Sequence, residues 1–168
     1  MKFPDFNTGG PGGKAFVKLK DGESIKGVFR GDPHPFRQHW VENRGVFCPG
    51  KSCPLCAEGE KSSFRFRINF VMQENGAWVA KVFEQGWTSY DYLKSMHESD
   101  YDLEKTLIKI TRRGTGTDTS YSILPVPNGT LKKPDVDAIA AVALHDLSPK
   151  EKSEAAATPE ESGEDIPF

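Results

Sequence analysis

Three cysteines and one histidine, crowded into the segment His39–Cys56, are the residues of this sequence best suited to do chemistry. Eight residues separate His39 from Cys48, four separate Cys48 from Cys53, and two separate Cys53 from Cys56. The last pair forms the turn Cys-Pro-Leu-Cys, and a Cys-x-x-Cys turn directs two thiolates at one tetrahedral ion. Three cysteines cannot all pair as disulfides. The spacing therefore predicts one Zn²⁺ held by His39, Cys48, Cys53 and Cys56.

His34 is an alternative fourth ligand, because it lies only five residues before His39. We favour His39, which begins a strand-like stretch, over His34, which lies between two prolines. In either case four protein ligands leave no open coordination position, so the site is expected to be structural.

Known catalytic patterns fit this sequence poorly. A zinc deaminase needs His-x-Glu followed by Pro-Cys-x-x-Cys, whereas here the proline lies inside the cysteine pair. There is no Gly-x-Ser-x-Gly elbow and no P-loop lysine. We therefore expect a protein that is not an enzyme and has no catalytic residues.

Cationic and aromatic residues alternate along several segments, which is typical of proteins that bind single-stranded nucleic acid. Residues 14–67 contain eleven Lys or Arg against six Asp or Glu. Regular alternation assigns Phe64, Phe66 and Phe70 to the core, and leaves Arg65 and Arg67 on the opposite face, where a solvated sheet face is the alternative to a binding groove. The predicted nucleic-acid contacts are Arg37, Trp40, Arg44, Arg65, Arg67, Trp78, Lys81, Tyr90, Arg112 and Arg113.

Short alternating segments joined by turn residues must position these side chains, and they predict a mainly β fold. Strands are expected at 14–20, 24–31, 36–44, 63–73, 77–85, 103–111 and 119–126, with hairpin turns at Asp21-Gly22 and Asn75-Gly76. Helices are expected at 88–96 and 134–145. The most economical arrangement is an OB-fold-like five-stranded antiparallel barrel with a small zinc subdomain at 39–56, one inserted helix and a C-terminal helix. An SH3-like barrel is the alternative.

The ends of the chain differ in composition from its body. Residues 1–13 are rich in glycine and predict a flexible arm, 14–147 form the OB-fold domain, and 148–168 predict a disordered tail. From Lys150 onward the tail has six acidic residues and two lysines, and it ends in Asp165, Ile166, Pro167 and Phe168. An exposed apolar tip on an acidic tail predicts binding to a pocket on a partner protein. The sequence shows neither a secretory signal nor an apolar run of membrane-spanning length, so we expect a cytoplasmic protein.

The tip Asp165-Ile166-Pro167-Phe168 resembles the C-terminal tip of bacterial single-stranded DNA-binding proteins. The body, from about Lys14 to Asn128, resembles the zinc-containing single-stranded DNA-binding proteins of tailed bacteriophages, through Arg37, His39, Trp40, Cys48, Gly50, Cys53, Pro54, Leu55 and Cys56. The resemblance implies an OB-fold with a zinc subdomain of one histidine and three cysteines. It also implies a protein that coats single-stranded DNA in phage replication, recombination or repair, inside the bacterial host cell. It implies as well that the tip recruits replication and repair proteins. Two alternatives are an OB-type RNA-binding or transcription accessory protein and a protein–protein adaptor.

Overall fold

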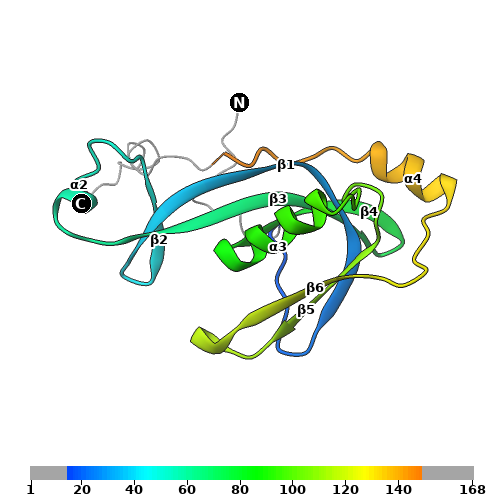
Figure 1. Cartoon of the computed structure of the whole chain (residues 1–168), viewed down its shortest axis with the longest axis horizontal. Coiled ribbons are helices and arrows are strands. Elements are labelled where there is room, and N and C mark those ends of the chain that lie inside the picture. The colour runs from blue at the N-terminus through cyan, green and yellow to red at the C-terminus, as the bar shows by residue number, and fades with distance from the viewer. Residues whose placement is uncertain (1–14, 149–168) are drawn as a thin grey trace.

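The computed structural model describes residues 15–148, and the fold is mainly β as predicted (Figure 1). Its strands are β1 (Ser24–Val41), β2 (Arg44–Cys48), β3 (Ser62–Glu74), β4 (Ala77–Gln85), β5 (Ile108–Arg113) and β6 (Ser120–Pro125). The helices are α2 (Pro54–Ala57), α3 (Trp87–Glu98) and α4 (Lys133–Ala140), with one 3-10 turn, η2 (Gly116–Asp118). No helix of this described part is long and apolar enough to cross a membrane.

All six strands pair antiparallel in one sheet of order β4-β3-β1-β5-β6, with β2 added to the far end of β1. Within residues 15–148 no ladder joins β4 to β6, so the sheet is open and the predicted OB-fold-like barrel is not confirmed. The long strand β1 joins the predicted strand 24–31 to most of the predicted strand 36–44, but it ends at Val41, and Arg44 already begins β2. A register shift between Arg30 and His34 interrupts its pairing with β3, and a bulge of this kind tolerates the prolines that surround His34.

The alternation in β3 correctly predicted the core. Phe66, Ile68 and Phe70 are buried in one cluster with Phe29 of β1 and Phe83 of β4. The rings of Phe29 and Phe70 meet edge-on at 4.9 Å, a favourable aromatic geometry. Helix α3 covers this face through Leu93 and Met96, and β5 and β6 complete it with Ile108, Ile110 and Ile123.

Two turns predicted as hairpins behave differently. Asn75 and Gly76 both adopt positive φ, 53° and 82°, as a two-residue hairpin requires, and β3 and β4 pair on either side of them. The expected hairpin at Asp21-Gly22 does not form. Instead, Phe16 makes a parallel bridge to Val82 on the outer edge of β4, and the N–H of Val17 donates to the Val82 carbonyl at 2.9 Å. The prediction of a strand at 14–20 paired with 24–31 was wrong.

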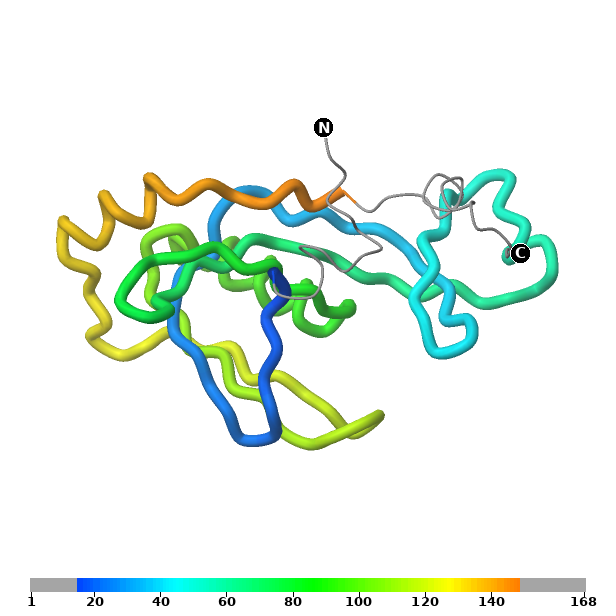
Figure 2. The backbone as a smooth tube through the Cα atoms, turned by 180° about the vertical axis from the view of Figure 1, so that it is seen from behind, coloured from blue at the N-terminus to red at the C-terminus, as the bar shows by residue number. Residues whose placement is uncertain are grey.

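Helix α4 ends at Ala140, five residues before the end of the predicted helix 134–145. At this helix end the carbonyl of Ile139 accepts hydrogen bonds from both the guanidinium of Arg30, at 2.9 Å, and the N–H of Val142, at 3.2 Å. The following residues 141–148, here called the C-terminal strap, run back alongside β1 (Figure 2). Asn69 of β3 fixes the strap, because its side-chain amide donates to the His145 carbonyl at 3.1 Å and accepts the His145 N–H at 2.9 Å.

Candidate metal centre and surface groove

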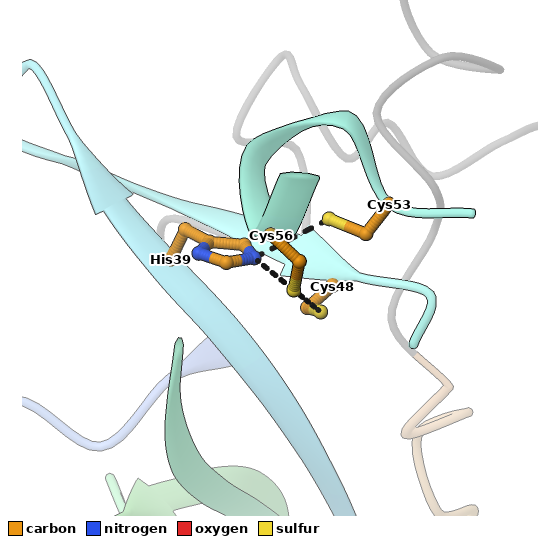
Figure 3. Close-up of side chains that lie close together, drawn as sticks. All are labelled: His39, Cys48, Cys53 and Cys56. Carbon is orange, nitrogen blue, oxygen red and sulfur yellow. Dashed lines mark hydrogen bonds between the residues drawn. The ribbon is translucent and has the colours of Figure 1, made fainter. Parts of the chain in front are cut away.

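His39 and the three cysteines lie together at the end of the sheet remote from α4 (Figure 3). His39 comes from β1, Cys48 ends β2, Cys53 is the N-cap of α2, and Cys56 lies within α2. Their four ligand atoms all lie within 4.8 Å of one another. The Nε2 atom of His39 is 3.3 Å from Sγ of Cys53 and 3.5 Å from Sγ of Cys56.

These separations match a single tetrahedral metal. Metal–sulfur and metal–nitrogen bonds of about 2.3 and 2.0 Å, as for zinc, place neighbouring ligand atoms about 3.5–3.8 Å apart. The sulfurs of Cys48 and Cys56 are 3.6 Å apart, far beyond the roughly 2.05 Å of a disulfide, and all three cysteines are free. His39, Cys48, Cys53 and Cys56 could therefore bind one metal ion.

The ring of His39 is oriented for this purpose. It is fully buried, and its Nδ1 lies 3.0 Å from the Lys61 carbonyl oxygen, which can only accept a hydrogen bond. Nδ1–H is therefore the donor, and the lone pair of Nε2 is directed at the sulfurs, an arrangement common among metal-bound histidines. His34 does not belong to the cluster. It lies opposite Arg67 in the β1–β3 ladder.

Neighbouring groups shift the pKa values of two of the thiols in opposite directions. Burial raises the pKa of Cys53, but hydrogen bonds with the backbone of Cys56 and with the side chains of Cys48, His39 and Cys56 lower it to a net value of about 7. The hydrogen bond with Cys48, together with burial, raises the pKa of Cys56 to about 11. Cys53 thus supplies a thiolate near neutral pH, while Cys56 ionises when a cation offsets the added charge.

An open groove of about 640 Å³ lies on the face of β3 opposite the core, and we call it the tryptophan groove. Trp40 of β1 is 64% exposed there. Because side chains alternate along a strand, Arg65 and Arg67 face this groove while Phe66 faces the core. The lining residues are Phe16, Gln38, Trp40, Gly45, Ser63, Arg65, Arg67 and Glu84.

Arg67 is held rigidly in the groove. Its guanidinium carbon lies 5.3 Å from the centre of the Phe16 ring and 5.0 Å from that of Phe36, within cation–π range of both. Its Nε donates to Glu84, and Arg65 also contacts Glu84, with Nη2 at 3.4 Å from Oε1. One carboxylate therefore serves two arginines, and the Nε of Arg65 is buried without a hydrogen-bond partner.

Other predicted nucleic-acid residues lie elsewhere. Arg37 is on the opposite face from Arg65 and donates to the hydroxyl and carbonyl of Ser62 at 2.9 and 2.8 Å. Trp78 packs beneath α4 and its indole N–H contacts Asp135 at 3.4 Å. Tyr90 packs on Phe64 and Phe66. The structure does not bring these three residues into the tryptophan groove.

The remaining predicted cations are similarly dispersed. Arg112 donates to the Leu19 carbonyl at 2.7 Å and to the Thr119 hydroxyl at 3.2 Å, so it ties together chain segments. Lys81 forms an ion pair with Glu74 at 3.4 Å. Arg44 and Arg113 are exposed at a strand end, at the start of β2 and the end of β5. Of the ten predicted residues, only Trp40, Arg65 and Arg67 share the groove.

Sequence analysis missed five groove residues, namely Phe16, Gln38, Gly45, Ser63 and Glu84. Two of them could have been predicted from the sequence, because Gln38 lies two residues before Trp40 and Ser63 two residues before Arg65, and residues two apart on a strand face the same side. Glu84 becomes recognisable only through the β3–β4 register, which places it directly opposite Arg67.

Comparison of this chain with protein-family models, with curated proteins and with solved structures finds no match. The predicted tip Asp165, Ile166, Pro167 and Phe168, and the acidic tail that bears it, lie outside the described residues. The resemblance to phage single-stranded DNA-binding proteins therefore remains a prediction.

Proposed function

We propose that this protein binds single-stranded DNA without sequence preference, through the tryptophan groove. The observation that carries the proposal is an indole, 64% exposed, beside Arg65 and Arg67 in one open groove. Exposed aromatic faces stack on bases of any kind, and arginines contact the phosphates. The open shape of the groove favours a flexible strand over a small molecule, because small molecules are usually held in enclosed, mostly apolar pockets.

We further propose that the sheet is an OB-type barrel. The strand order β4-β3-β1-β5-β6 and the helix α3 between β4 and β5 agree with that fold, as does the groove on the outer face of β3. Contact between the core ring of Phe83 on β4 and that of Tyr121 on β6, at 6.0 Å, supports the approach of the two open edges.

We infer that the metal is Zn²⁺ and that its role is structural. A site of three thiolates and one imidazole suits zinc, and four protein ligands leave no position for substrate or water. The ion would fasten the segment 42–61, here called the metal lobe, to the strands that carry Trp40 and Arg65. His39 itself lies opposite Ser62, the first residue of β3.

We assign the acidic tail two linked tasks as part of the same proposal. It competes with DNA for the basic groove, and its tip recruits replication and repair proteins once DNA has displaced it. This scheme places the protein in phage DNA replication, recombination or repair, in the cytoplasm of a bacterial host. The support is the charge of residues 150–168, six acidic residues against two lysines, together with the tip sequence.

Titration of a fluorescent oligothymidylate at two salt concentrations tests the proposal. Tight binding should weaken with salt, with a log–log slope of about −0.7 per phosphate neutralised. Deleting residues 150–168 should strengthen binding at low salt, and unchanged affinity would remove the competition between tail and DNA. A flat salt response would exclude a phosphate-binding groove. Equal or tighter binding of an oligouridylate would instead favour an RNA-binding protein, and no binding of either would favour an adaptor.

A further inference from the structure

Two tryptophans of the described chain are mostly exposed, Trp40 at 64% and Trp87 at 57%. Tryptophan is highly buried on average in folded proteins, so two exposed indoles need a reason. Trp40 lines the tryptophan groove, whereas Trp87, the first residue of α3, lies outside it. The position of Trp87 relative to the groove therefore decides whether base stacking, proposed for Trp40, also explains the exposure of Trp87.

Topology brings Trp87 to the side of the groove, close to the level of Arg65. Strand β3 begins near the metal lobe and β4 returns toward it, so α3 starts on that same side (Figure 1). Gly86, which precedes Trp87, lies against Arg65, because Nη1 of Arg65 is 3.8 Å from the position that a Cβ on Gly86 would occupy. Arg65 therefore lies between the groove and the start of α3.

The edge of β3 between the groove and Trp87 is not covered by β4. The last pair of the β3–β4 ladder is Phe66 with Gln85, and the chain then leaves β3 through Gly86. The carbonyl oxygen of Phe64 lies 3.8 Å from the same Cβ position, so this turn runs along the edge of β3. Trp87 packs on Phe64, which faces the core, so a strand lying in the groove reaches Trp87 by crossing the edge of β3 at the Gly86 turn, where no residue of β4 pairs with β3.

The indole of Trp87 is also held in place. It meets the Phe64 ring nearly perpendicularly, at 5.2 Å and 81°, and the Tyr90 ring at 5.7 Å and 34°. These contacts fix the ring while more than half of its surface stays exposed. A fixed aromatic surface loses little conformational entropy when a base stacks on it, which favours binding.

We propose that Trp87 is a second stacking platform for the same nucleic-acid strand. The strand lies on Trp40, contacts Arg65 and Arg67 through its phosphates, and places a neighbouring base on Trp87 beside Arg65. This inference rests on the proposed function and deepens it, since it gives the strand a path and assigns a binding residue outside the groove.

The test compares Trp87→Ala with the native protein on oligothymidylates of about 4 and about 12 nucleotides, which span the usual range of footprints for one OB domain. Trp87→Ala should weaken binding of the longer oligomer roughly 5- to 150-fold, the effect of losing one stacked base, and affect the shorter one much less. Trp87→Phe should restore most of the affinity. Tyr92→Ala is the matched control, because Tyr92 is another aromatic residue of the same helix and is 41% exposed. This variant should bind both oligomers as tightly as the native protein does.

A fluorescence measurement separates stacking from a merely structural role. In Trp40→Phe, the longer oligothymidylate should still quench the emission that remains, because Trp87 still stacks, while the half-buried Trp78 lies beneath α4. Equal affinity of Trp87→Ala and native protein for the longer oligomer would overturn the proposed role of Trp87, but would leave binding in the tryptophan groove intact. An equal loss for both lengths, with altered circular dichroism, would show that Trp87 only supports α3. Failure of native protein to bind either oligomer would overturn the path and the proposed function together.

Discussion

Glu84 is the residue that sets the charge of the tryptophan groove. Its carboxylate lies within contact distance of Arg65 and Arg67, and its side chain is only 19% exposed. A phosphate entering the groove must compete with this carboxylate for the same donors, as both are acceptors that arginine binds well. We therefore predict that Glu84→Gln raises affinity for oligothymidylate several-fold and steepens the salt slope, by about 0.7 per additional phosphate contact.

Glu74→Gln is the matched control for this prediction. Glu74 belongs to the same hairpin and pairs with Lys81, at 3.4 Å, but does not line the groove. Its substitution should leave the salt slope unchanged. A loss of affinity in Glu84→Gln would contradict the prediction, and would show that Glu84 serves mainly to hold the arginines in position.

Residues could be assigned from sequence where their chemistry depends on local spacing. The predicted cysteines, with His39, meet in one cluster because Cys53 and Cys56 share one turn and Cys48 ends the adjoining strand. Arg112 and Trp78 could not be assigned in this way. Arg112 donates to the carbonyl of the distant Leu19, and Trp78 is covered by α4, so the positions of both side chains depend on contacts between parts of the chain far apart in sequence.

At the scale of elements, Asn69 fixes the C-terminal strap to the sheet. It is 2% exposed, and its amide satisfies both backbone groups of His145, whose ring also hydrogen bonds to the Ala80 carbonyl at 2.8 Å. Asn69→Ala removes the hydrogen-bond partner of both the part-buried N–H and the part-buried C=O of His145. We predict a loss of about 1–3 kcal/mol in the free energy of unfolding, measured by denaturant titration, and faster hydrogen exchange at the His145 amide.

Two further variants make this prediction specific. Gln73→Ala changes an exposed position of the same strand and should have little effect on stability. Asn69→Asp keeps the acceptor for the His145 N–H but loses the donor and places a buried carboxylate against the His145 carbonyl, so at neutral pH it should destabilise the protein at least as much as Asn69→Ala. Unchanged exchange at His145 in Asn69→Ala would mean that other contacts hold the strap.

Elements were predictable where one stretch of sequence determines both shape and burial. Strand β3 alternates from Phe64 to Phe70 and the Asn75-Gly76 turn fixes the register of β4, so this hairpin follows from local chemistry, although the burial of Asn69 and Val71 on its other face does not. The segment 16–20 also alternates, but alternation does not specify which sheet edge accepts it, and Phe16 joins β4 instead of β1. The early end of helix α4 is accompanied by a contact that local sequence does not specify, since Arg30, more than one hundred residues away, donates to the carbonyls of Ile139 and Ala140.

At the scale of the whole molecule, the metal lobe and the main core are separate in structure. The main core cluster contains buried residues from β1, β3, β4, α3, β5 and β6 but none of the four candidate ligands. The apolar core therefore does not depend on metal for its burial. The lobe contributes one short strand, β2, and the four-residue helix α2, which together bury little apolar surface.

Removal of the metal should consequently unfold the lobe and leave the sheet folded. Chelation is expected to abolish the thiolate absorption of the Co²⁺-substituted protein and to speed amide exchange at 44–57, while amides of β3 beyond Phe66 stay protected. Affinity for oligothymidylate should fall, since Trp40 pairs with Gly45 at the base of the lobe. Complete loss of β3 protection would show instead that the metal supports the whole fold.

Lowering the pH should also release the metal and so unfold the lobe. The direction of this pH effect follows from the ionisation of the thiols. The pKa of Cys53 is lowered to about 7 in the folded protein, so this thiolate forms more readily than in the unfolded chain, and it is lost as the pH falls through 7. A bound metal needs all its thiolates, and protons compete with it for each one. Metal affinity should therefore drop about tenfold per pH unit for each thiol that must ionise, measured by competition with a chromophoric chelator between about pH 8 and pH 5.

Cys53→Ser should bind metal more weakly with a shallower pH dependence, because one of the competing protons is gone. An affinity independent of pH over this range would exclude thiolate ligands and, with them, the structural role assigned to the lobe.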